Sequence, residues 1–315
     1  MKSIPLSICL LIILILCSRV ATQAQQPLQV KTHTDGEKIS VYRPDINKPI
    51  LTQNAGLRFR PYLHPITTPD GKGQLTQFSP GHHRHQTGLY WGLTRVNGRD
   101  YFHNPGEGYW KRVSTRIEKA EGKQVAWSTV YEMLGKDGSP VLTETQKWSI
   151  LDSGKGHFIL DLEWQGAAKE KVTVSKYNYG GLFLRMPWKR GIRAQALNAS
   201  GLLNQKGEGK RSKWVDLGMQ IEGLSEDGHI AIFDHPQNDG FPNPWRIDGQ
   251  FGIGPSHARL GNWFIEEGKV KTFQHRFIIY EGNADAKKLN RQWDQWVGKT
   301  TSDNGAVSAE ENKKP

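Results

Sequence analysis

Residues 112–166 alternate apolar and polar side chains over four successive segments, and this pattern limits the fold more than any other feature of the chain. Short turns rich in glycine, lysine and aspartate separate the segments, which lie near residues 113–120, 125–134, 141–150 and 157–164. In the last segment four apolar residues share one side of an extended chain: Phe158, Leu160, Leu162 and Trp164. Strands joined by such short turns pair antiparallel, so the sequence predicts an all-β protein, a sandwich or a barrel.

The first 24 residues have the features of a secretory signal, with Lys2, an apolar run over residues 8–16 and small residues before the cleavage point. We therefore expect a periplasmic or secreted protein with no membrane span in the mature chain. Both cysteines, Cys9 and Cys17, lie inside this signal. The mature chain would then have neither disulfides nor cysteine-based metal sites.

The remainder of the chain is expected to form one β-sandwich domain over residues 25–299. Leu289, Trp293 and Trp296 fall at helical spacing, which predicts an amphipathic helix over residues 284–297 whose tryptophans pack on the sandwich. Residues 300–315 are polar, and we expect a disordered tail there.

Three of the eleven histidines, His82, His83 and His85, fall within four residues. A Pro–Gly turn precedes them, and a half-buried strand is predicted directly after them, from Leu89. If the alternation of that strand continues backwards, His83 and His85 point into one space. They would then be either a functional pair or polar caps at a strand end.

Two later stretches also carry chemistry. On either side of a double glycine, Tyr177, Tyr179 and Arg185 fall at odd-numbered positions and would share one face of an extended chain. Apolar residues fall at the even-numbered positions and would share the other face. Further along, a predicted buried strand is followed by Asp234 and His235, which begin a proline-rich loop that ends at Trp245 and Arg246. We expect the three stretches to meet at one site.

The chain resembles a family of exported bacterial proteins that carries the label "methane oxygenase PmoA" and is otherwise a domain of unknown function. The matching pieces cover nearly the whole mature chain in order: residues 60–65, 68–71, 83–89, 214–216, 230–236 and 244–245. The oxygenase label conflicts with a chain that has no spanning segment after its signal. Many members carry histidine where this chain has Gln86, and glutamine is a poor ligand for transition metals. The resemblance implies an association with carbohydrate utilisation, without an established activity.

Several chemistries fit these residues. A divalent metal would be bound by His83 and His85, but no spacing demands it, so we predict no cofactor. Glycoside hydrolysis needs two carboxyl groups, and the motifs hold few. β-Elimination from an acidic sugar needs a base, an acid and cations that stabilise an enolate, and the chain concentrates these groups. The net charge of +11 favours an anionic partner, and no nucleic-acid motif is present, so an acidic oligosaccharide or polysaccharide is the expected partner.

We therefore predict an exported lyase or dehydratase that performs β-elimination on acidic oligosaccharides. The expected catalytic residues are His83, His85, Tyr177, Tyr179 and His235. The expected substrate-binding residues are Arg60, His64, Gln86, Lys176, Arg185, Asp234, Trp245 and Arg246. A non-catalytic carbohydrate-binding protein and a structural component of a surface complex are the alternatives. The expected fold is a large antiparallel β-sandwich with one C-terminal α-helix, of the extended supersandwich type seen in sugar mutarotases and some polysaccharide lyases.

Overall fold

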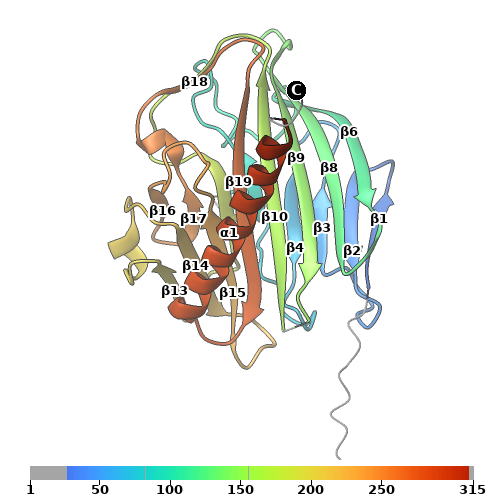
Figure 1. Ribbon diagram of the computed structural model, residues 1–315, viewed down its shortest axis with the longest axis vertical. Helices are drawn as coiled ribbons and strands as arrows, with labels where there is room; N and C mark the ends of the chain where they lie inside the picture. The colour runs from blue at the N-terminus through green and yellow to red at the C-terminus, as the bar shows by residue number, and fades with distance from the viewer. Residues whose placement is uncertain (1–26, 82, 155, 312–315) are drawn as a thin grey trace, which may run out of the picture.

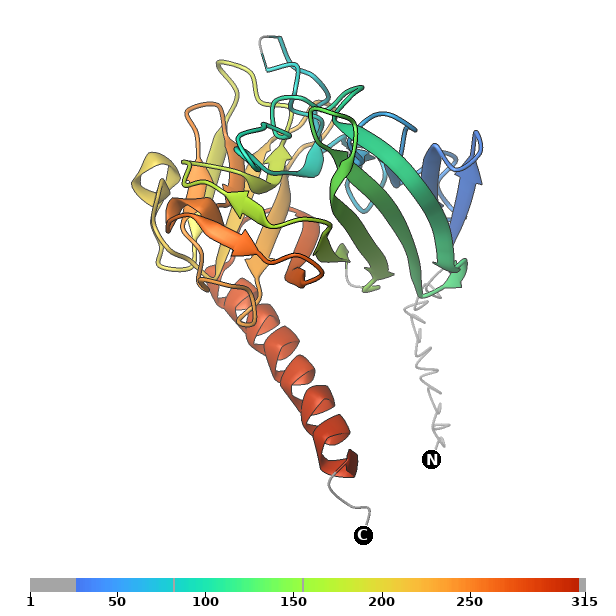
Figure 2. The ribbon, with the colours of Figure 1, turned by 90° about the horizontal axis from the view of Figure 1, so that it is seen from above.

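Two antiparallel β-sheets packed face to face make up most of the molecule (Figures 1 and 2). The computed structural model describes residues 27–81, 83–154 and 156–311, and the side-chain surroundings through residue 298. One long helix follows the last strand. The predicted all-β antiparallel sandwich with a C-terminal helix is thus confirmed. The predicted signal at residues 1–24 lies outside the described residues. In the described part of the chain, no helix is long and apolar enough to cross a membrane.

The first sheet has nine strands and joins early segments of the chain to late ones. Its strands, in spatial order, are β16 (Trp245–Ile247), β17 (Gly252–Pro255), β12 (Gly181–Arg185), β5 (Leu89–Gly92), β4 (Tyr62–Ile66), β3 (Leu51–Asn54), β2 (Lys38–Tyr42), β1 (Leu28–His33) and β7 (Glu121–Gly122). Because β5 pairs antiparallel with β12, the histidine stretch before β5 lies beside the Arg185 end of β12, whereas the tyrosines before β12 lie beside Thr94, which follows β5.

The second sheet has eight strands. In spatial order they are β13 (Ala194–Asn198), β14 (Trp214–Gln220), β15 (Asp227–Asp234), β19 (Val270–Glu281), β10 (His157–Ala168), β9 (Pro140–Asp152), β8 (Gln124–Leu134) and β6 (Trp110–Lys119). The remaining short elements are β11 (Val172–Val174), β18 (Trp263–Ile265) and the 3₁₀ turns η1 (Asn204–Gly207) and η2 (His257–Arg259).

The main core fills the space between the two sheets, and strand periodicity explains which residues enter it. In β10 the predicted apolar set, from Phe158 to Trp164, is buried there, while Asp161 and Glu163 face outward. In β15 both faces are covered, because Ile230 and Ile232 enter the main core while Ala231 and Phe233 pack under the helix. A strand buried on both faces reads as a continuous apolar run.

Helix α1 (Ala286–Glu311) lies across the outer face of the eight-stranded sheet (Figure 1). Leu289 and Trp296 are buried against Phe233 and Tyr280 of that sheet, as the helical spacing predicts. The helix begins two residues later than predicted and its backbone continues past Val297. The expected disordered tail at residues 300–315 falls where side chains, and from residue 312 the backbone, are not described, and it stays a prediction.

Candidate functional site

A pocket of about 120 Å³ lies on the outer face of the nine-stranded sheet, beside β5 and β12. Its lining combines histidines, aromatic rings and charged groups: His83, His85, Gln86, Phe102, His103, Tyr179, Phe183, Arg246 and Asp248. Five of these nine were predicted from the sequence as site residues. The pocket is where the histidine stretch, the tyrosine segment and the segment around Arg246 meet.

A turn, and not a strand, aims the two predicted histidines into one space. The backbone N–H of His83 donates to Pro80, and that of Gln86 donates to His83, so the chain reverses before β5 begins at Leu89. The rings of His83 and His85 lie 5.9 Å apart in an edge-to-face arrangement. The expected alternation through the histidines is therefore wrong, although the shared orientation that it predicted is present.

A chain of hydrogen bonds runs from Asp100 through His103 to Tyr179. The Tyr179 hydroxyl lies 3.1 Å from Nε2 of His103, and Nδ1 of the same ring lies 2.6 Å from the Asp100 carboxylate. Burial favours the neutral form of Asp100, but hydrogen bonds from the side chain and backbone of His103 outweigh it and lower the pKa of the carboxyl. Burial and the neighbouring Tyr177 hydroxyl raise the pKa of Tyr179. The three groups form the arrangement of a proton relay, in which a carboxylate orients an imidazole against a hydroxyl.

His85 lies against this relay and is neutral at physiological pH. Its ring centroid is 4.5 Å from that of His103. Burial lowers the pKa of His85 to about 4, and the nearby His103, Arg60 and His83 act in the same direction. A neutral imidazole has a free lone pair, so His85 can accept a proton without first losing one.

Two buried arginines lie next to the pocket and have no ionised hydrogen-bond partner within the described part of the chain. Arg60 is fully buried, and its hydrogen bonds go to neutral acceptors: the backbone carbonyls of Tyr101, Phe102 and His85, and the Thr87 hydroxyl. Burial lowers the pKa of Arg60 to about 10, which leaves it charged at neutral pH. Arg185 donates to the carbonyl and the side-chain oxygen of Gln250.

Carboxylates lie near these arginines without bonding to them directly: Asp100 and Glu144 attract Arg60, and Asp248 attracts Arg185. Arg246, which lines the pocket, is paired with Glu208 at 2.9 Å. Asp248 also lines the pocket, and one of its oxygens accepts from the backbone N–H groups of Gln250 and Gly252. Neither arginine lines the pocket, but a buried cation without a direct ionic bond among the described residues attracts an anion that enters nearby.

Several buried polar atoms around the pocket have no hydrogen-bond partner among the described residues. They are Oε1 of Gln86, the hydroxyl of Tyr90, Nε of Arg60 and Nε of Arg185. Gln86 lines the pocket, and Tyr90 packs against Phe102 and Phe183 of its wall. An unsatisfied buried group costs about 1–3 kcal/mol, so such a cluster is typical of a place that a polar ligand or water completes.

The other predicted residues near the pocket occupy its edge. The Tyr177 ring lies 4.8 Å from that of Tyr179 and packs under Arg95. His64 is bonded through Nδ1 to Thr76, and its ring lies 5.9 Å from that of Phe78. Lys176 is exposed and does not line the pocket.

The structure does not bring Asp234, His235 or Trp245 to the pocket. Asp234 and His235 end a strand of the other sheet, where His235 packs on Trp296 of the helix. The Asp234 carboxylate is buried and holds the following loop by accepting from Asn238 and Asn243. Trp245 is fully buried and donates to the carbonyl of Ser212, so it offers no surface to a sugar. The loop from Asp234 contributes to the pocket only through Arg246.

As site residues, sequence reasoning missed Asp100, Phe102, His103, Phe183 and Asp248. The first three belong to an aromatic, glycine-rich loop whose approach to Tyr179 is set by tertiary packing. The only local signal was the Asp–x–x–His spacing, which lets His103 bond to Asp100 within one turn. For a metal, His83 and His85 remain the predicted pair; within the described ranges, no group of three His, Cys, Asp or Glu side chains is arranged to hold an ion.

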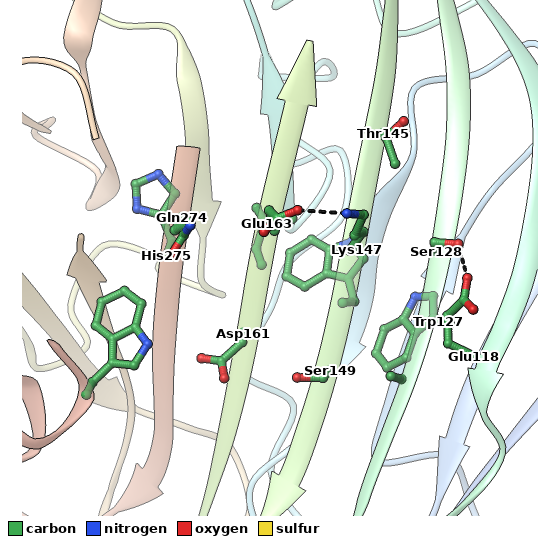
Figure 3. Close-up of a pocket in the computed structure, with 14 residues that line it drawn as sticks. Glu118, Trp127, Ser128, Thr145, Lys147, Ser149, Asp161, Glu163, Gln274 and His275 are labelled. Carbon is green, nitrogen blue, oxygen red and sulfur yellow. Dashed lines mark hydrogen bonds and ion pairs between the residues drawn. The ribbon is translucent and has the colours of Figure 1, made fainter. Parts of the chain in front are cut away.

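A larger hollow of about 610 Å³ lies on the outer face of the eight-stranded sheet, but its charged groups are paired with neighbouring side chains. Lys147 pairs with Glu163 at 2.9 Å, and Ser128 donates to Glu118 at 2.8 Å (Figure 3). Asp161 pairs with Arg276 through both carboxylate oxygens. These groups are already satisfied by their neighbours, whereas those around the smaller pocket are not.

Distant similarities to solved structures include the galactose 1-epimerase of Lactobacillus acidophilus, at 7% identity and a TM-score of 0.38, over 82% of this chain and 100% of that one. The GalM/aldose epimerase homologue of C. elegans is 10% identical with a TM-score of 0.34, over 80% and 98% of the two chains. The GH36 alpha-galactosidase AgaA of Geobacillus stearothermophilus is 9% identical with a TM-score of 0.32, over 56% of this chain and 28% of that one. At such TM-scores these likenesses say nothing about what this chain binds.

No curated protein matches the sequence. A family model matches residues 29–294, nearly the whole described chain, and its description gives no oxygenase activity. The chain belongs to this family, the family of unknown function DUF6807.

Proposed function

We propose that this protein is an exported carbohydrate-active enzyme, a lyase or dehydratase that performs β-elimination on an acidic oligosaccharide. The observation that carries the proposal is the Asp100–His103–Tyr179 relay beside the neutral ring of His85, in one pocket. β-Elimination needs a base and an acid on the same substrate, and this pocket offers both.

In this reaction His85 takes the proton from the carbon next to the sugar carboxylate. The electron pair of that C–H bond forms a carbon–carbon double bond, and the bond from the adjacent carbon to the leaving oxygen breaks. Tyr179 gives its proton to that oxygen. His85 then loses its proton to solvent, and Tyr179 regains one from solvent by way of His103, which Asp100 orients.

The charges around the pocket support an acidic substrate. Among the residues that the structure describes, no carboxylate is hydrogen-bonded to Arg60 or Arg185, and Arg246 lies 5.6 Å from the Tyr179 ring. These cations would attract a substrate carboxylate, and Arg246, which lines the pocket, would stabilise the enolate that forms in the transition state. The bound carboxylate would also raise the pKa of His85 and so strengthen it as a base.

The test is to incubate the purified protein with acidic and neutral oligosaccharides while following the ultraviolet absorbance of an unsaturated sugar acid. We expect turnover of an acidic oligosaccharide, and a loss of about 10²- to 10⁴-fold in kcat for His85→Ala. The matched control is His33→Ala, since His33 lies on β1 and bonds to Tyr42. Binding of an acidic sugar without turnover would instead indicate a carbohydrate-binding protein, and wild-type turnover by His85→Ala would refute His85 as the base.

A further inference from the structure

Four aromatic side chains form a surface next to the pocket: Phe59, Tyr62, His64 and Phe78. We call it the aromatic platform. Phe78 is 44% exposed, and its ring is stacked on Tyr62 with centroids 5.3 Å apart and planes at 28°. Phe59 meets Tyr62 edge to face at 5.8 Å, and His64 lies 5.9 Å from Phe78. Single exposed aromatics are ordinary, but a stacked group with one exposed ring is typical of a binding surface.

Backbone hydrogen bonds fix the exposed ring in place. Phe78 forms a β-bridge with Thr87. The N–H of Gln77 donates to Arg185, and that of Ser79 donates to Gln86. The backbone on both sides of the exposed phenyl ring is therefore held in place. Because the segment is already ordered, the protein loses little conformational entropy when a ligand stacks on the ring.

The aromatic platform is continuous with the pocket. Tyr62 of β4 pairs in register with Tyr90 of β5 and packs against the cluster of Tyr90, Phe102 and Phe183. Phe102 and Phe183 line the pocket. On the other side Phe78 is paired with Thr87, the neighbour of the pocket residue Gln86.

The pocket is too small to hold an oligosaccharide, so part of a longer substrate must extend outside it. Its volume is about 120 Å³. A cavity of about 150 Å³ accepts one benzene ring, and a sugar ring with its substituents is larger than benzene, so this pocket accommodates no more than one sugar ring. The next sugar of an oligosaccharide must lie outside. Phe78 presents an apolar ring face there, and the C–H face of a pyranose is apolar as well.

We infer that the aromatic platform is a second sugar subsite, so that the substrate is an oligosaccharide in which one ring occupies the pocket and a neighbouring ring stacks on Phe78. This inference rests on the proposed function for its pocket ring. It assigns a role in binding, not in proton transfer.

The test measures binding and turnover of galacturonic acid, glucuronic acid and their linear oligomers of two to four units. For Phe78→Ala we expect about tenfold weaker binding of the oligomers, unchanged binding of the monomers, and rescue by Phe78→Trp. Phe264→Ala is the matched control, because Phe264 is 48% exposed on β18 and does not line the pocket. Unfolding curves verify that each variant folds.

The two proposals fail separately. If the wild type binds oligomers more tightly than monomers and Phe78→Ala removes the difference, the subsite stands even where no unsaturated product forms, and only the lyase reaction is refuted. If Phe78→Ala and Phe264→Ala bind every length equally well, the subsite is refuted. It is also refuted if the wild type binds none of these oligomers.

Discussion

At the scale of single residues, His85 has the environment that matters most. Burial and three neighbouring positive or titratable groups keep its ring neutral, and neutrality is what a general base requires. Tyr179 must instead stay protonated, because a general acid has to keep its proton until the reaction. Burial supplies this, since it raises the pKa of the hydroxyl. One pocket therefore holds a base that stays deprotonated and an acid that stays protonated over the same pH range.

The pH profile of kcat/KM follows from these two groups. Because the pKa of His85 in the free protein is lowered to about 4, we expect kcat/KM to stay high down to about pH 4 and to fall below it. The raised pKa of Tyr179 predicts no alkaline loss from this group up to its ordinary value of about 10. Steady-state kinetics over a series of buffers measures the profile. An acidic limb centred near the ordinary histidine pKa of about 6.5 would contradict a base whose pKa is lowered by burial.

At the scale of elements, the turn between Phe78 and β5 determines where His85 lies. Gly88 in this turn has φ +86°, and a Cβ added there would lie 2.5 Å from the carbonyl oxygen of Leu63. Only glycine allows this approach, because other residues are strained at positive φ and would also clash.

We predict that Gly88→Ala destabilises the protein by about 2 kcal/mol or more and lowers turnover, because the turn must shift and carry His85 and Gln86 with it. Denaturant unfolding measures the stability. Gly98→Ala is the control, since Gly98 has φ +78° but no atom within 4 Å of an added Cβ. Equal losses in the two variants would mean that backbone conformation alone, and not the contact with Leu63, makes glycine necessary.

Strand-level features could be predicted from the sequence, and loop-level features could not. The alternation from Phe158 to Trp164 and the opposite parities of Phe183 and Leu184 depend only on the two-residue period of a strand. His103 reaches Tyr179 because two loops fold over the same sheet, and no local pattern encodes that contact. The prediction of His235 as a pocket residue is wrong for a similar reason. The apolar run before it predicts a buried strand, but which sheet that strand joins depends on the topology of the whole chain.

At the scale of the whole molecule, a buried polar network lies in the core between the sheets. The carboxylate of Glu144 accepts from Trp164 at 2.7 Å and from Gln146 at 2.8 Å. Gln146 in turn accepts from Gln53 of the other sheet, and Gln53 accepts from Trp127. Glu144 is fully buried, and burial raises its pKa to about 7. The hydrogen bonds orient the group but do not offset the loss of solvation.

This shift makes the stability depend on pH. The folded protein binds the Glu144 proton more tightly than the unfolded chain, whose pKa is about 4.5, so the contribution of this group is fully present below pH 4.5 and is lost as the pH rises through 7. The loss amounts to about 3 kcal/mol. We predict that Glu144→Gln removes this part of the pH dependence. The measurement is the free energy of unfolding of both proteins between pH 4.5 and 8, and parallel curves would refute the prediction.

The central claim is that Tyr179, through its contact with His103, transfers a proton in the pocket. The most direct measurement compares kcat of Tyr179→Phe with that of Tyr42→Phe on the best acidic oligosaccharide. Tyr42 is the matched control, because its hydroxyl also bonds to a histidine, His33, on strands that do not line the pocket. We predict a loss of about 10²- to 10⁴-fold for Tyr179→Phe and none for Tyr42→Phe. Wild-type turnover by Tyr179→Phe would contradict the account.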